Sequence, residues 1–459
     1  MGFSLLLGLV VLTPFIYGGG SGLLDSLFGR VGGPRADLLL EVAAFAIGAV
    51  TLLGRGALRS PGRLAVPIAA IMGIVALGTF QILPIPPSVL RSIAPINLRI
   101  YDETARMFAL FGRNPPHPRV SIAPSSTISS FLLLLAFFSL FFSAANLLRS
   151  RERRRLFALT LFATAGIQIA MSTASAALGE GPAFLSFGLG RLAPYLEIVL
   201  ALAFGALWAE VLTNRDRAPG GATDGAERFE IRSMPLVGRF LLWALFVFGI
   251  FQTGSRVALL AAILTTVAVL AIALFHRRVR FRRRRVVGML LALLAVVLFS
   301  ATIAKARPLV RFLESDPGGL NMSARVAIWK TAYRAWREFP ILGSGLGTFP
   351  EAARRVQPSD LGGRLDHARS DPLQALVTGG IVGGVLAAIL YLSLFLLLVA
   401  AFRDQKHREE SALILGGFGA LLCLSIHGLF DTAYPLTAIP AMLACVVGAA
   451  WAAARRRIS

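Results

Sequence analysis

The sequence predicts an all-α, polytopic membrane protein with about twelve transmembrane helices. Hydrophobic residues make up 56% of the 459 residues and charged residues only 15%, and the mean hydropathy is +0.71. This composition is typical of a chain that lies mostly in lipid rather than in water. The apolar stretches alternate with polar or basic segments, which is the pattern of consecutive membrane spans.

Each predicted span is an apolar stretch of a length that suits a membrane helix. The first stretch lacks the basic N-terminal region of a signal peptide, so we interpret it as a helix that stays in the membrane. The predicted spans are 3–18, 37–54, 64–83, 127–148, 156–176, 193–213, 238–252, 256–275, 286–304, 372–401, 411–429 and 435–453.

The net charge of +22 comes from Lys and Arg residues that lie between the apolar stretches. More than half of the 46 Lys and Arg residues fall in the even-numbered connections and the C-terminal tail, most densely at 149–155 and 276–285. Because short basic loops are retained in the cytoplasm, we predict that both termini are cytoplasmic. The basic runs therefore indicate topology signals and lipid headgroup contacts rather than nucleic-acid binding.

The Cys and His content gives no sign of a metal centre. Cys423 and Cys445 both lie in apolar segments, so they predict neither a disulfide framework nor a metal-binding pair. The five histidines are dispersed along the chain, and none is spaced from another as metal ligands are. We therefore predict no metal and no cofactor.

Two long polar segments are predicted on the face opposite the cytoplasm. The first is rich in proline and contains a short helix around 101–111, and the second contains an amphipathic helix over 321–340. The segment 218–227 is predicted to be a flexible cytoplasmic linker. We divide the chain into an N-terminal membrane region, 1–236, with outer loop 84–126; a candidate catalytic region, 237–435, with outer loop 305–371; and the last helix with its basic tail, 436–459.

The predicted helix 321–340 has one aromatic side and one basic side. At about 100° per residue, Arg325 projects from the aromatic side. A guanidinium on an apolar face requires a partner, so Arg325 either snorkels or stacks on Trp329, or binds an anion in a cleft. The aromatic side carries Trp329, Ala332, Trp336 and Phe339, and the basic side carries Lys330, Arg334 and Arg337.

Two further arginines stand at predicted helix starts on the same face. Arg256 lies in the first turn of a helix that Thr253 or Ser255 caps, and Arg369 precedes a helix whose N-cap we expect to be Asp371. Helix N-termini attract anions, although Arg256 could instead contact lipid phosphates. We expect Arg256, Arg325 and Arg369 to converge on a dianionic group such as pyrophosphate, which guanidinium groups bind well.

The segment 343–349, GSGLGTF, has glycines at alternate positions. Gly345 and Gly347 could form a backbone nest for phosphate, but a tight turn against the membrane is the favoured interpretation.

For a general base, His367 has the most suitable ordinary pKa, and it is otherwise an exposed loop residue. Nearby alternatives are Asp366, Asp360 and Glu351. His427 and Asp431 lie one helical turn apart, either as a functional ionisable pair or as a pair that fixes the helix end. Glu41 and Glu197 are weaker candidates.

Several of these motifs together resemble the O-antigen ligase and polymerase superfamily over residues 240–435. They are TGSR at 253–256, RVAIWKTAYRAWREFPILGSGLGTF at 325–349, SDPLQALVTGGIVGG from Ser370 onward, and HGLFD at 427–431. The resemblance implies a metal-independent membrane glycosyltransferase of the GT-C type in the bacterial inner membrane, with its active site at the periplasmic face. It also implies that Arg256 and Arg325 bind the pyrophosphate of an undecaprenyl-linked glycan donor.

The resemblance further implies an acceptor, which is lipid A–core for a ligase and another lipid-linked glycan for a polymerase. Other implied partners are membrane lipids, a chain-length regulator and a flippase, and no nucleic acid. Arg369 stands where ligases have a histidine, and Thr378 stands where relatives have a glutamate. These differences favour a polymerase, with a ligase as the alternative. A lipid-linked oligosaccharide transporter is the alternative of another class.

Overall fold

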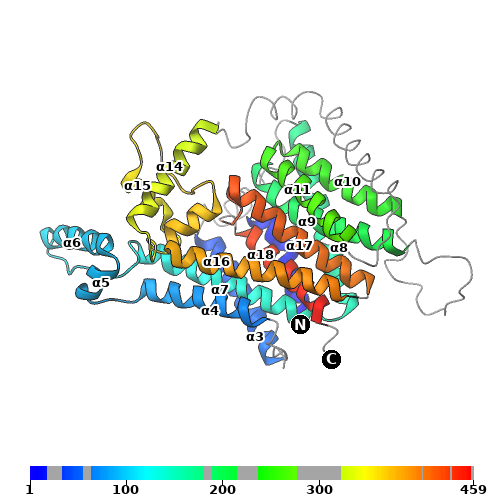
Figure 1. The fold of residues 1–459 in the computed structure, drawn as a ribbon, viewed down its shortest axis with the longest axis horizontal. Helices are drawn as coiled ribbons and strands as arrows, with labels where there is room; N and C mark the ends of the chain where they lie inside the picture. Colours follow the sequence, from blue (N-terminus) through cyan, green and yellow to red (C-terminus); the bar gives the residue numbers. More distant parts are fainter. Residues whose placement is uncertain are drawn as a thin grey trace, which may run out of the picture.

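The computed structural model describes residues 1–17, 34–54, 64–178, 189–213, 236–275, 322–405, 407–434 and 437–455. These residues form helices and no strands, which confirms the all-α fold (Figure 1). Each predicted span except 286–304, which lies outside the described residues, coincides with a helix. These helices are α1 (Gly2–Tyr17), α3 (Pro34–Leu53), α4 (Ala65–Ile82), α7 (Pro124–Leu147), α8 (Arg151–Leu178), α9 (Leu189–Thr213), α10 (Leu236–Gln252), α11 (Arg256–Phe275), α16 (Asp371–Asp404), α17 (Arg408–Phe430) and α18 (Ala438–Ala454).

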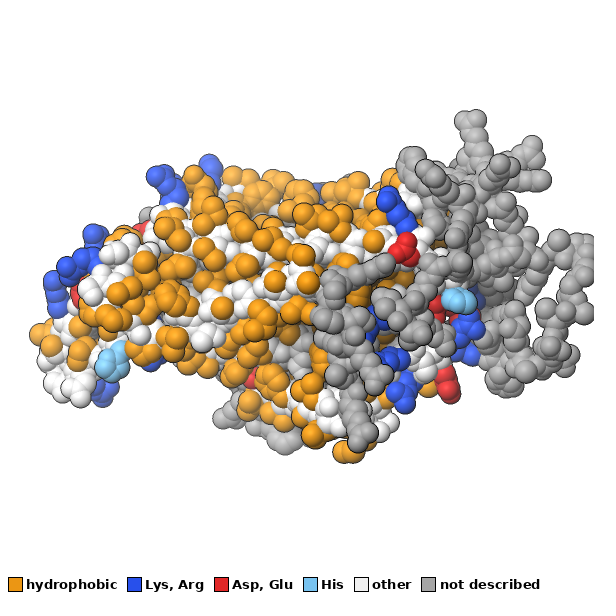
Figure 2. Space-filling model, turned by 60° about the horizontal axis from the view of Figure 1, so that its bottom comes forward, with side chains coloured by type: hydrophobic (Ala, Val, Ile, Leu, Met, Phe, Trp, Pro, Cys, Tyr) orange, Lys and Arg blue, Asp and Glu red, His pale blue; other side chains and the backbone are white. Residues whose placement is uncertain are grey.

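The helix lengths and the surface agree with a membrane protein. In the part of the chain that the structure describes, five helices are long and apolar enough to cross a membrane and five more apolar helices are shorter. Figure 2 shows a predominantly hydrophobic middle, with Lys and Arg side chains gathered at the left end and again toward the right. A belt of this kind is the surface that a protein presents to the lipid hydrocarbon.

Small residues set the register between α9 and α17, which pack closely in the middle of the bundle. A Cβ atom on Gly205 would lie 2.2 Å from the Ala412 carbonyl oxygen, and one on Gly416 would lie 3.0 Å from the Cα of Leu202. Glycines at such a contact let two helix backbones approach, as is common inside membranes. Because the two helices run antiparallel, this register brings Glu197 level with His427 toward one end of the bundle.

The two polar segments form one cap at the end of the bundle (Figure 1). The cap contains α5 (Pro87–Ile93), α6 (Pro95–Leu110), α14 (Met322–Glu338) and α15 (Phe349–Val356). An apolar cluster that includes Phe339 and Phe349 packs against Ile96, Ile100 and Ile122, so the two segments share a core. The first segment thus has two helices rather than the single short helix predicted around 101–111.

The long helix α16 is broken at Gly380. The sequence predicted one continuous span over 372–401, without this break. Gly380 has a φ of 63° and a ψ of −167°, which is accessible to glycine but not to other residues. The N–H groups of Ile381 and Val382 donate to the carbonyls of Pro340 and Ile341, at 2.8 Å and 3.2 Å. The loop after α14 therefore satisfies the backbone groups that the break leaves open.

At the opposite end of the bundle, the basic run 149–155 has a structural role. Arg154 is buried and pairs with Glu410 at 3.1 Å between Nη2 and Oε1, so it is a structural residue at the junction of α8 and α17. The neighbouring pair of Arg151 and Glu409 is partly exposed. The basic runs at 276–285 and the linker 218–227 lie outside the described residues.

Candidate functional site

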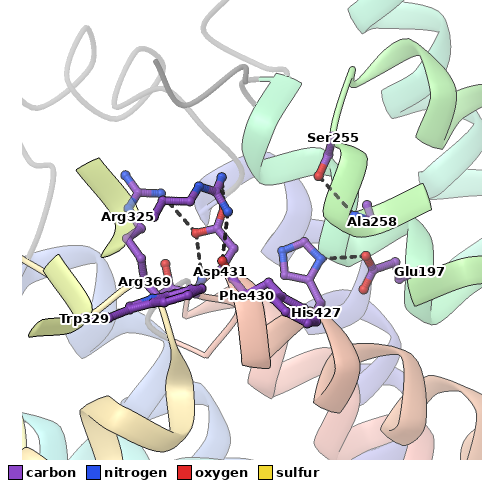
Figure 3. Close-up of polar contacts among 10 residues, drawn as sticks. Glu197, Ser255, Ala258, Arg325, Trp329, Arg369, His427, Phe430 and Asp431 are labelled. Atoms are coloured by element: carbon purple, nitrogen blue, oxygen red, sulfur yellow. Dashed lines mark hydrogen bonds and ion pairs between the residues drawn. The ribbon is translucent and has the colours of Figure 1, made fainter. Parts of the chain in front are cut away.

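Arg325 points from α14 toward the end of α17 (Figure 3). Its side chain is only 8% exposed, as expected for a residue on the inner face of an amphipathic helix. Nη1 donates to the Phe430 carbonyl at 2.8 Å, and Nη2 lies 3.4 Å from Oδ2 of Asp431. Arg325 therefore has the partners that a buried guanidinium requires, which are the Asp431 carboxylate and the Phe430 backbone carbonyl.

Arg369 reaches the same carboxylate from the other side. Its Nη1 donates to Oδ1 of Asp431 at 3.1 Å, while its carbonyl oxygen accepts a hydrogen bond from Nε1 of Trp329 at 2.9 Å. Among the described residues, Arg369 is the only non-glycine residue with positive φ, at 51°. This conformation is strained for a side chain with a Cβ, and such strain concentrates at functional sites. The structure therefore brings Arg325 and Arg369 together, as expected.

Asp431 follows the last residue of α17 and joins the two arginines. Burial alone would raise the pKa of this carboxyl, but the Arg369 guanidinium, the Thr432 backbone N–H and Arg325 hold its pKa below the ordinary value. Thr432 donates to Oδ1 at 2.8 Å. Asp431 is therefore an ionised carboxylate at neutral pH, with two cations beside it.

Arg256 is the first residue of α11, and its side chain is exposed. Ser255 caps this helix, because its Oγ accepts a hydrogen bond from the Ala258 N–H at 3.2 Å. α11 packs against α17 with Thr265 and Val269 beside Gly419. At about 1.5 Å per residue, this antiparallel contact places the start of α11 near the level of the end of α17. Arg256 is thus at the same end of the bundle, and its role in the site stays a prediction.

A second polar contact lies beside the arginines. Nδ1 of His427 is 2.6 Å from Oε1 of Glu197, and both side chains are almost fully buried. In Figure 3 the ring lies between Glu197 and the side occupied by Asp431. His427 and Asp431 were expected to pair with each other, but the side-chain partner of His427 is Glu197. The sequence offered Glu197 only as a weak, isolated candidate, because its partner lies 230 residues away.

The other base candidates are Glu351 in α15 and three residues of the segment between α15 and α16. His367 is half-buried, and Asp360 is exposed. Arg364 holds Asp366 at 3.1 Å and Glu351 at 3.6 Å, so these two carboxylates already have a cationic partner. The role of His367 as the base stays a prediction.

The alternate glycines form a tight turn against the break in α16. Gly343, Gly345 and Gly347 all have positive φ values, of 74°, 117° and 73°. The Gly345 N–H donates to the Thr378 carbonyl at 3.1 Å, and Gln81 accepts from the Leu346 N–H at 3.0 Å. Because these amides have internal partners, the structure supports the turn, and phosphate binding by Gly345 and Gly347 stays a prediction.

Asp371 has a role other than the predicted one. The N-cap position of α16 is Ser370, and no side chain caps the helix there. Instead Oδ2 of Asp371 accepts from the Ala433 N–H at 3.3 Å, in the turn that follows Asp431. The prediction of Asp371 as N-cap was wrong because the carboxylate satisfies a backbone group of a distant segment. Asp371 thus lies next to the site. Its position in the SDPLQ motif was the sequence feature that could have indicated this.

No group of three or more His, Cys, Asp or Glu side chains in the described residues is arranged to hold a metal ion. The charged groups of the site are instead two guanidiniums around one carboxylate, with a buried His–Glu pair next to them. Such an arrangement can hold an anion, orient an imidazole and stabilise charge that develops on a leaving group.

The fold and this site define an all-α membrane protein with a cationic cluster at the junction of the bundle and its cap. Residues 240–388 match the family model described as O-antigen ligase. The match confirms the resemblance, and over these residues the chain carries the domain of the O-antigen ligase and polymerase superfamily. Arg256, Arg325 and Arg369 lie inside the matched region, whereas Glu197, His427 and Asp431 lie outside it. Among curated proteins, none matches the chain.

Proposed function

We propose that this protein is a glycosyltransferase that extends a polysaccharide at the periplasmic face of the bacterial inner membrane. Its donor would be a glycan on undecaprenyl pyrophosphate, and its acceptor another lipid-linked glycan. The observation that carries the proposal is the convergence on Asp431 of Arg325 and Arg369, two residues inside the region that matches this superfamily.

The arginine cluster supports pyrophosphate recognition by its geometry. Asp431 holds two guanidiniums close together in a fixed arrangement, and guanidinium groups bind phosphate oxygens well. Arg369 is 33% exposed on its side chain, so part of its guanidinium faces the outside, where an anion can approach. Arg256, at the start of α11, would add a further positive charge together with the helix N-terminus.

The proposed reaction is the transfer of a glycosyl group. An acceptor hydroxyl oxygen forms a bond to the anomeric carbon, and the bond from that carbon to the pyrophosphate oxygen breaks. The electron pair of the broken bond leaves with undecaprenyl pyrophosphate, and the hydroxyl proton passes to a base. Fixed guanidiniums lower the barrier because the leaving group gains negative charge as the bond breaks.

The base would be His367 in the cap or His427 in the bundle. His367 lies on the segment that leads into Arg369, and an imidazole suits proton transfer near neutral pH. A histidine base is usually oriented by a carboxylate. For His427 that carboxylate is Glu197, whose Oε1 lies 2.6 Å from Nδ1 of His427. The ligase alternative, in which the glycan passes to lipid A–core, is favoured by the description of the matching family.

The deciding experiment is the glycan profile of a strain that lacks this protein, with the profile of the complemented strain as control. Single repeats at the surface without a ladder of longer chains would support the polymerase. Full-length chains on the lipid carrier beneath a bare surface would identify a ligase instead. Single repeats confined to the cytoplasmic leaflet would refute both functions and indicate a transporter.

A further inference from the structure

An aromatic stripe runs along α14 where its inner face meets the outside of the cap, and Trp336 in this stripe also packs against the apolar core of the cap. Trp329, Tyr333 and Trp336 are spaced by four and three residues, so they lie on one side of the helix over two turns. The rings of Tyr333 and Trp336 have centroids 5.7 Å apart and an interplanar angle of 54°. Tyr333 is 50% exposed, and both tryptophans are partly exposed. The stripe thus presents adjoining aromatic surface to whatever lies outside the cap.

A row of cations borders this stripe. Lys330, Arg334 and Arg337 are exposed, and none of them forms an ion pair with a described residue. Two other cap arginines are compensated, because Arg355 holds Glu338 at 3.0 Å and Arg364 holds two carboxylates. The positive charge along α14 is therefore available to an external anion.

The stripe begins at the arginine cluster. Trp329 donates to the carbonyl of Arg369, and Arg325 lies one helical turn before Trp329 (Figure 3). From Trp329 to Trp336 the helix rises about 10 Å, which is enough to contact a short oligosaccharide. A chain whose reacting end lies at Arg325 and Arg369 could therefore follow α14 away from the site.

We propose that this stripe and its basic border bind an acidic glycan, the chain that the site extends. The inference rests on the proposed function and adds the substrate class. Aromatic rings pack against the C–H faces of sugar rings, and guanidinium or ammonium groups pair with the carboxylates of uronic acids. Between Lys330 and Arg337 every exposed side chain is basic or aromatic, with none of the aliphatic residues that a lipid-facing helix presents. The direct contact of the stripe with the arginine cluster, through Trp329 and Arg369, favours a glycan over a lipid surface.

The test measures binding of defined sugars to the purified full-length protein in nanodiscs. The probes are an oligogalacturonate, which is acidic, and a malto-oligosaccharide of the same length, which is neutral. We expect the acidic probe to bind at least about tenfold more tightly and its affinity to fall with added salt. Tyr333→Ala and the double variant Lys330→Glu/Arg337→Glu should each weaken the acidic probe about tenfold.

Two matched controls lie at the other end of the cap. Phe111→Ala removes an exposed aromatic ring beside α6, and Arg106→Glu reverses an exposed charge on α6. Neither should change the affinity for the acidic probe. An equal loss in the controls, or no loss in the α14 variants, would refute the location.

Equal affinity for both sugars, or no binding of either, would refute the acidic substrate class. Binding to phosphatidylglycerol vesicles that depends on Lys330 and Arg337, without binding of the sugars, would assign the surface to lipid instead. The proposed function is tested separately by Arg325→Ala, which should retain the bound probe and lose product. If Arg325→Ala makes normal product, the proposed function is refuted. The glycan surface is tested independently, by the binding of the acidic and neutral probes.

Discussion

Arg325 and Asp431 are 106 residues apart in the chain, yet Nη2 of the arginine lies 3.4 Å from Oδ2 of the aspartate. The pair joins α14 in the cap to the end of α17 in the bundle. Asp431 also receives Arg369, so one carboxylate fixes two cations that belong to different segments. This arrangement keeps positive charge at the junction in a defined geometry before any substrate binds.

Replacement of Arg325 should remove activity without removing the protein. We predict that Arg325→Ala lowers product formation by about a hundredfold or more, because a fixed donor at developing charge contributes on that scale. Arg325→Lys should also be impaired, because a point charge cannot replace a planar fork. The measurements are the glycan ladder and the amount of protein in the membrane.

Arg354→Ala is the matched control for this prediction. Arg354 is an exposed arginine of the cap on α15, and its loss should leave the ladder unchanged. Normal product from Arg325→Ala would remove the pyrophosphate site, and full activity of Arg325→Lys would indicate simple charge neutralisation.

Asp431→Asn should destabilise the junction of cap and bundle. Both guanidiniums lose an ionised partner, so the free energy of unfolding should fall by about 2 kcal/mol. This is less than for a fully buried pair, because Arg369 is partly exposed. The thermal unfolding midpoint of the purified protein should therefore fall. An unchanged midpoint would mean that the two pairs contribute nothing to stability.

The same residue predicts a pH dependence. The folded pKa of Asp431 lies below its ordinary value of 3.8, so its contribution is complete above that value and is lost as pH falls through the lowered pKa. The difference in unfolding midpoint between the native chain and Asp431→Asn should thus be constant near neutral pH and shrink in strong acid. A difference that shrinks near neutral pH would contradict the assignment.

The pH–rate profile should separate the two candidate bases. If His367 is the base, His367→Ala loses rate mainly at neutral pH, near the ordinary pKa of an imidazole. Glu197→Gln removes the carboxylate that holds His427 and should then leave the shape of the profile unchanged. The opposite result, with a profile altered by Glu197→Gln but not by His367→Ala, would move the role to His427.

Gly343 and Gly363 form a matched pair that separates backbone strain from lack of space. Both have positive φ, of 74° and 83°, but a Cβ on Gly343 would lie 2.3 Å from the Thr378 carbonyl oxygen, whereas one on Gly363 meets nothing within 4 Å. Gly363→Ala should cost about 1 kcal/mol. Gly343→Ala should cost more than about 3 kcal/mol and lower the folded yield. Equal losses of folding yield and unfolding midpoint would show that the turn is not packed as described.

Two neighbouring glutamates should differ in their contribution to stability. Glu410 is buried with Arg154, so Glu410→Gln should cost about 3 kcal/mol, as expected when one partner of a buried pair is removed. Glu409 pairs with Arg151 on a partly exposed surface, so Glu409→Gln should cost less than about 1 kcal/mol. Thermal unfolding of both variants in the same detergent measures the difference, and equal effects would contradict it.

The predicted features that the structure confirms are those with a local cause. The span limits follow from hydropathy, and the inward position of Arg325 follows from helical periodicity within α14. The cap was only partly foreseen, because the helices in it are short and each depends on contacts with the other polar segment. The break at Gly380 was missed, since glycine occurs in many continuous membrane helices and only the carbonyls of Pro340 and Ile341 make the break stable.

The sequence by itself determined the all-α membrane class, the helices and the superfamily motifs, because composition, period and short-range spacing carry this information. Only the tertiary structure decided that Asp431 is the partner of Arg325 and Arg369, and that Glu197 is the partner of His427. These pairs depend on how α9, α14 and α17 pack, and the packing is set by close glycine contacts and shared apolar cores. Side chains far apart in the chain meet only once that register is fixed, so no local pattern records their pairing.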